Sequence, residues 1–79
     1  HAGMSSAAWS HAFSTAYEDF CARVDAAEDT AIDPYAAENP AEFFAVLSEV
    51  FFELPQVLQQ EYPAIYRQLS AFYRQDPAA

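Results

Sequence analysis

DPYAAENPAEFFAVLSEVFFEL, residues 33–54, contains the pattern of a central helix. Asn39 can cap a helix whose first position is Pro40, where a proline loses no hydrogen bond. Glu42 then falls at the third helical position, so the start resembles a capping box with Asn in place of Ser or Thr. The spacing predicts a helix over residues 40–53, which the following proline ends.

The apolar side chains of this helix cover one wide arc when they are placed at 100° per residue. The arc contains Phe43, Phe44, Val46, Leu47, Val50, Phe51 and Leu54, whereas Phe52 lies outside it. Glu42, Glu49 and Glu53 form a narrow stripe on the opposite side. An arc this wide predicts a central helix with apolar partners on nearly all sides. The acidic stripe is either a solvated face or the part of the helix that carries chemistry.

The same criteria place three more helices around the central one. A first helix is predicted over residues 5–26, with an arc of Trp9, Phe13, Ala16, Tyr17, Phe20, Cys21 and Val24. The acidic segment after it reads as a linker, in which Ile32 could add a short extended contact. A short helix is predicted over 56–61 and a last one over 63–74, with an apolar face of Ile65, Tyr66, Leu69, Phe72 and Tyr73.

The predicted fold is therefore all-α, a small bundle of three to four helices. One helical domain is expected over residues 5–77, because 79 residues are enough for one small domain. Residues 1–4 read as a tag remnant or a disordered start, and 78–79 as a tail. With 53% apolar and 16% aromatic residues, the chain has more large side chains than so short a bundle can hide. Some of this surface is expected to pack on a missing part of a longer protein or on another copy.

Charge and composition exclude several classes of partner. The net charge of −9, with three Arg and no Lys, argues against binding to nucleic acid or to an anionic membrane. No apolar run reaches the length of a membrane span, and the start lacks the pattern of a signal peptide. The single cysteine, Cys21, fits a reducing, cytoplasmic compartment, and its place on an apolar arc predicts a buried, inert thiol. His11 is predicted to face solvent, whereas Arg67 and Arg74 are candidates for pairing with the acidic helices.

Three strings from residue 35 onward resemble the C-terminal signature of the Mlc titration factor A family. They are YAAENPAEFFAVLSE at 35–49, followed after one residue by FF at 51–52, then YPAIY at 62–66 and FYRQDP at 72–77, and together the resemblance spans about residues 31–77. The family consists of bacterial zinc peptidases that are distantly similar to the protease domain of anthrax lethal factor. The resemblance implies that this chain is the C-terminal part of a gluzincin-like metallopeptidase domain.

The resemblance also implies roles for individual residues. Glu42 corresponds to the third zinc ligand, and Tyr35 to a residue that stabilises the oxyanion of the transition state; without the resemblance, Tyr35 reads as an aromatic plug at the helix start. Glu49 is either a partner of the zinc-binding histidines or a solvated residue, and Glu53 is solvated or interfacial. The family takes its other two ligands from a His-Glu-x-x-His helix, which this chain lacks. The fragment alone is therefore expected neither to hold zinc tightly nor to hydrolyse peptides.

Three functions remain open at this point. The first is a part of a zinc-dependent, aminopeptidase-like hydrolase, with zinc and a peptide substrate bound by the intact protein together with its N-terminal catalytic portion. The second is a non-catalytic module that binds a sugar-responsive transcriptional repressor. The third is a homo-oligomer that forms through exposed aromatic surface. A His-Glu-x-x-His motif upstream in the parent gene would favour the peptidase.

Overall fold

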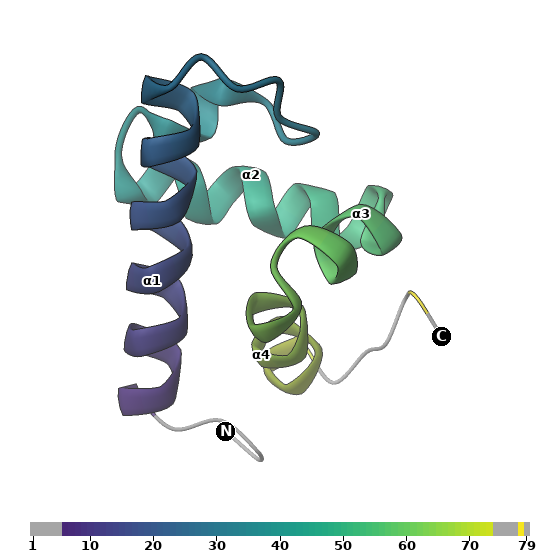
Figure 1. Cartoon of the computed structure of the whole chain (residues 1–79). Coiled ribbons are helices and arrows are strands. Elements are labelled where there is room, and N and C mark those ends of the chain that lie inside the picture. The colour runs from purple at the N-terminus through teal and green to yellow at the C-terminus, as the bar shows by residue number, and fades with distance from the viewer. Residues whose placement is uncertain (1–5, 74–77, 79) are drawn as a thin grey trace.

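The computed structural model describes residues 6–73 and 78, and all regular structure in this part of the chain is helical. The elements are α1 (Ser6–Asp25), the 3-10 helix η1 (Pro34–Ala37), α2 (Pro40–Glu53), α3 (Pro55–Glu61) and α4 (Pro63–Tyr73). In Figure 1, α1 stands at one side, α2 runs across to α3, and α4 turns back below α2. The all-α prediction is confirmed. The predictions for residues 1–5, 74–77 and 79 lie outside the described residues.

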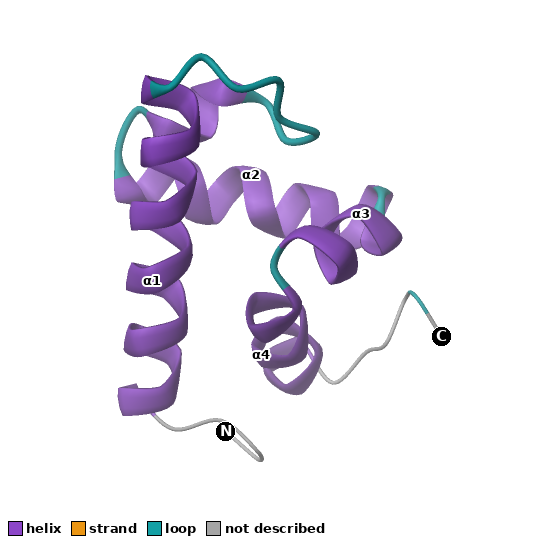
Figure 2. Cartoon of the chain, viewed as in Figure 1, coloured by secondary structure: helices purple, strands orange, loops and turns teal. Residues whose placement is uncertain are grey.

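Each helical element after α1 begins at a proline, which needs no hydrogen-bond acceptor at that position. Single residues, Leu54 and Tyr62, separate α2 from α3 and α3 from α4, with φ near −140°. A residue before proline is disfavoured in the helical region, so each proline stops the preceding helix as well as starting its own. Figure 2 shows how short these two connections are beside the loop after α1.

The core is built around α2. Its Phe43 ring contacts the rings of Phe13, Tyr17 and Phe20 on α1, with centroid distances of 5.5, 5.2 and 5.7 Å. The fully buried large side chains are Phe20, Ile32, Phe43, Leu47, Phe51, Leu58, Ile65 and Leu69. The prediction of a central helix is therefore right. None of the described helices is long and apolar enough to cross a membrane.

The predicted arc on α2 is too wide at its edges. Phe43, Leu47 and Phe51 follow one another at every fourth position and are buried, but Phe44 is 37% and Leu54 is 57% exposed. A helical wheel gives the direction of a side chain and not the neighbours that cover it. Because the covering elements lie on one side of α2, only the centre of the arc is buried.

The predicted linker contains structure that the sequence analysis did not anticipate. Asp33 Oδ1 accepts a hydrogen bond from Tyr35 N at 2.9 Å and so caps η1. Within this segment Ala36 is fully buried and Ile32 is 2% exposed. The segment is therefore a packed part of the bundle.

Candidate functional site

Glu42 lies in the first turn of α2, where the cap fixes its backbone. Asn39 Oδ1 accepts a hydrogen bond from Glu42 N at 2.9 Å, as the sequence predicts. The reciprocal bond of a capping box, in which Asn39 N–H donates to the Glu42 carboxylate, is not formed, and no other hydrogen bond to this carboxylate occurs within the described part of the chain. The side chain is half-buried. Glu42 thus offers carboxylate oxygens next to the positive end of the helix dipole.

Tyr35 lies on η1, directly before α2. Its side chain is 54% exposed, so the interpretation as an aromatic plug is wrong. An aromatic plug would be covered by neighbouring side chains, but in this segment it is the small Ala36 that is buried. The phenol of Tyr35 is left open to solvent.

The segment that carries Tyr35 is held against α1 through one backbone carbonyl. Tyr17 donates its hydroxyl to Ala37 O at 3.2 Å, and Cys21 Sγ lies 3.9 Å from the same oxygen. Burial, followed by the hydrogen bond with Cys21, raises the pKa of Tyr17. Cys21 was predicted to be buried but is half-buried, because it faces the backbone of η1 and not the centre of the core. These contacts fix the position of η1 and therefore of the start of α2.

Glu49 and Glu53 lie further along α2, and both are exposed. They line a shallow hollow of about 330 Å³ together with Val50 and Leu54. Glu49 follows Glu42 after seven residues, which is roughly 10 Å along the helix axis. The prediction that Glu49 is either a partner of the zinc-binding histidines or a solvated residue stays a prediction.

The described residues contain no group of three or more His, Cys, Asp or Glu side chains that could hold a metal ion. His11 is exposed on α1, as predicted. A metal at Glu42 would therefore take its other ligands from outside this part of the chain.

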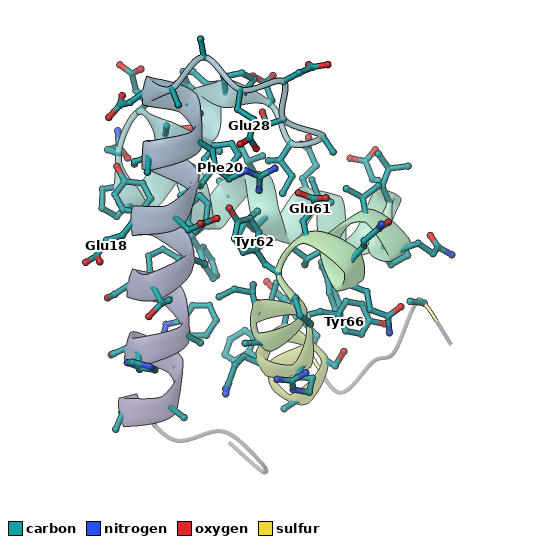
Figure 3. The ribbon with its side chains drawn as sticks, in the orientation of Figure 1. Glu18, Phe20, Glu28, Glu61, Tyr62 and Tyr66 are labelled. Carbon is teal, nitrogen blue, oxygen red and sulfur yellow. The ribbon has the colours of Figure 1, made fainter. Side chains whose placement is uncertain are left out.

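The strongest polar cluster was missed by the sequence analysis. Arg23 donates from Nε to Glu28 at 2.6 Å, from Nη2 to Glu61 at 3.0 Å and from Nη1 to the hydroxyl of Tyr62 at 3.2 Å. That hydroxyl in turn donates to Asp19 Oδ2 at 2.9 Å. Figure 3 shows Glu28, Glu61 and Tyr62 together on the inner side of α1, whereas Glu18 points away from the bundle.

The predicted pairing of Arg67 with the acidic helices is wrong for the described residues. Arg67 is exposed and forms no ion pair with them, whereas Arg74 lies outside the described residues. Arg23 takes this role because it is the cation that lies where α1, the loop after it and α3 meet. One local signal was available, the four-residue spacing between Asp19 and Arg23 on a helix.

Comparisons with known proteins agree with the resemblance described above. The family model for the glucose-regulated metallo-peptidase M90 matches residues 1–74 of the chain. Two relatives with the name Mlc titration factor A, from Yersinia pestis and Yersinia pseudotuberculosis, are each 45% identical over 75 residues. The aligned part covers 92% of this chain and 28% of each relative, so the chain spans less than a third of their length. No solved structure matches the chain.

Proposed function

This chain belongs to the glucose-regulated metallo-peptidase M90 family, and from that premise we propose that it is one part of a zinc-dependent peptidase. In the intact protein, Glu42 would be the third zinc ligand, and two histidines outside this chain would be the others. The observation that carries the proposal is the half-buried carboxylate of Glu42 on a capped helix start, which accepts no hydrogen bond from residues 6–73 or 78. A peptidase zinc site has three protein ligands and an open position, so one carboxylate from this chain suffices.

The surroundings of Glu42 suit a metal ligand. Its backbone is fixed by Asn39, so a carboxylate in this position loses little further backbone freedom when it binds. The positive end of α2 favours a negatively charged group there. A carboxylate oxygen is also an ordinary ligand of zinc, at about 2.0–2.2 Å. None of the described residues competes for this carboxylate through a hydrogen bond.

Tyr35 would act on the substrate in the same site. Bound zinc lowers the pKa of a water molecule and polarises the scissile carbonyl. The phenol of Tyr35 could then donate a hydrogen bond to the oxygen on which negative charge develops. Its exposure and its position on a segment held by Tyr17 and Ala37 support this role.

Zinc binding by the longer protein tests the proposal. We would measure the zinc affinity of the full-length polypeptide with a competing chelator, for the wild type and for Glu42→Gln. Loss of the ligand should weaken binding by at least 100-fold. Glu53→Gln is the matched control, since it removes the same charge from the same stripe roughly 16 Å away along the helix. Wild-type affinity in Glu42→Gln would refute the proposal.

A second candidate function comes from the name of the relatives. Mlc titration factor A is named for an action on Mlc, and a net charge of −9 together with exposed aromatic residues would suit a protein partner. In this alternative, the chain contributes a surface that binds a sugar-responsive transcriptional repressor and needs no zinc. Repressor binding that survives chelation and Glu42→Gln, in a protein without peptidase activity, would favour it.

A further inference from the structure

Aromatic side chains from three helices form a connected, partly exposed set, which we call the aromatic face. Its members are Trp9 on α1, Phe44 and Phe52 on α2, and Phe72 and Tyr73 on α4. The Trp9 and Phe44 rings lie 5.8 Å apart, and the Tyr73 ring lies 4.9 Å from both Phe52 and Phe72. Phe44, Phe52 and Phe72 are 37%, 47% and 39% exposed.

A hollow lies within the aromatic face. It has a volume of about 170 Å³ and is lined by Trp9, Phe44, Leu69 and Phe72, none of which is charged. An apolar cavity of about 150 Å³ can hold a benzene molecule, so this hollow has the size for one large apolar side chain. The hollow joins Phe44 to Phe72 and so links the two halves of the face.

Single exposed hydrophobic residues are normal on a protein surface, whereas contiguous exposed apolar patches of a few hundred Å² are often functional. Burial of a large apolar side chain contributes roughly 1.5–3 kcal/mol. Phe44, Phe52 and Phe72 are only partly buried in the bundle, so they realise only part of this burial free energy. Ala45, on the same side of α2, is small and exposed, which lets another element approach closely.

Two observations argue against a second copy as the partner. The exposed parts of Phe44, Phe52 and Phe72 together amount to roughly one whole ring, about 200–300 Å², whereas a stable interface takes about 800 Å² from each partner. Two copies with a net charge of −9 would also repel each other. A segment of the same polypeptide avoids both problems, because its covalent link supplies a high effective concentration.

We propose that the aromatic face is the docking surface for a further segment of the same polypeptide, which places one large apolar side chain in the hollow. The length of the relatives supports this occupant, since the chain covers only 28% of each. The inference rests on the part of the proposed function that makes this chain a piece of a longer protein. It does not depend on Glu42 or on zinc.

Cysteine labelling of the full-length polypeptide tests the docking surface. In a background without other reactive thiols, including Cys21→Ser, we would introduce Phe72→Cys and, separately, Phe52→Cys. The labelling rate of the native protein is compared with its rate in denaturant. Both thiols should be protected at least 100-fold. Gln59→Cys on α3, which is exposed and outside the aromatic face, should be protected less than 10-fold.

Each other outcome overturns the inference. Fast labelling at both positions would mean that the face is open in the whole protein. Protection that disappears on dilution would assign the face to a second copy. A reading frame that encodes no residues beyond the 79 of this chain, on either side, would remove the proposed occupant. The labelling experiment does not depend on zinc, so the two proposals can fail separately. Protection at Phe72→Cys, together with wild-type zinc affinity in Glu42→Gln, would refute the metal site and leave the docking surface standing.

Discussion

The hydroxyl of Tyr62 donates a hydrogen bond to Asp19 Oδ2 at 2.9 Å, across 43 residues of sequence. The bond joins the middle of α1 to the single residue between α3 and α4. Arg23 donates to the same hydroxyl and also binds Glu61 and Glu28. This cluster holds α1, the loop after it and the α3–α4 connection together at one edge of the core.

Arg23→Gln should destabilise the chain by about 1–3 kcal/mol, since it removes three charge-assisted hydrogen bonds from a side chain that is 22% exposed. Arg23→Lys keeps the charge but has no planar fork, so it should recover only part of the loss. Urea unfolding measures both variants. Arg67→Gln, an exposed control, should change stability by less than about 0.5 kcal/mol. An equal effect of the Arg23 and Arg67 variants would contradict the role of the cluster.

Stability should depend on pH through Tyr62. Burial, followed by the hydrogen bond to Asp19, raises the pKa of Tyr62 to about 12, against 10.0 without these effects. The folded state therefore holds the phenol proton more tightly than the unfolded state. The stabilisation that the protonated phenol gives to the folded state is complete below pH 10 and is lost as the pH rises from 10 to 12. Tyr62→Phe lacks the titrating group, so the difference in unfolding free energy between wild type and variant should shrink over this range. If the difference in unfolding free energy between wild type and Tyr62→Phe stayed constant from pH 10 to 12, Tyr62 would not be the source of the pH dependence.

Ala27→Gly should stabilise the chain by about 0.5–1 kcal/mol. Ala27 has φ of 57° at the end of α1, the left-handed region that glycine reaches without steric cost. The bond from Glu28 N to Arg23 O, at 3.0 Å, closes a Schellman-type end around it. Thermal unfolding would report the gain as a rise in Tm. Ala26→Gly at the adjacent position should destabilise instead, and a gain of equal size there would contradict the explanation.

Tyr35→Phe in the full-length protein should lower kcat by about 100- to 1000-fold and leave zinc affinity unchanged, because only a transition-state hydrogen bond is removed. Its effect on stability should stay within about 0.5 kcal/mol, since the side chain is exposed. Steady-state kinetics and chelator competition measure the two quantities. An unchanged kcat would exclude Tyr35 from the reaction.

The sequence predicts the helices well because their ends are local. Asn39 and Pro40 start α2, and the prolines at 55 and 63 start α3 and α4, all without reference to distant residues. Contacts between distant residues could not be predicted in this way. Glu61 and Tyr62 lie 38 and 39 residues from Arg23, and no pattern in the chain relates them.

The candidate site, unlike the helices, could not be predicted from local sequence patterns alone. Glu42 and Tyr35 were singled out by the resemblance to a family and not by spacing alone. The structure adds that one carboxylate is unbonded within the described residues and that one phenol is exposed. Neither fact follows from the sequence, because the same capping pattern would allow Glu42 to bond back to Asn39.

Zinc anomalous scattering from crystals of the full-length protein would show directly whether Glu42 is the third zinc ligand. We expect one strong peak about 2.0–2.2 Å from a carboxylate oxygen of Glu42, with two histidine nitrogens completing the protein ligands. A zinc peak whose ligands do not include Glu42 would contradict it.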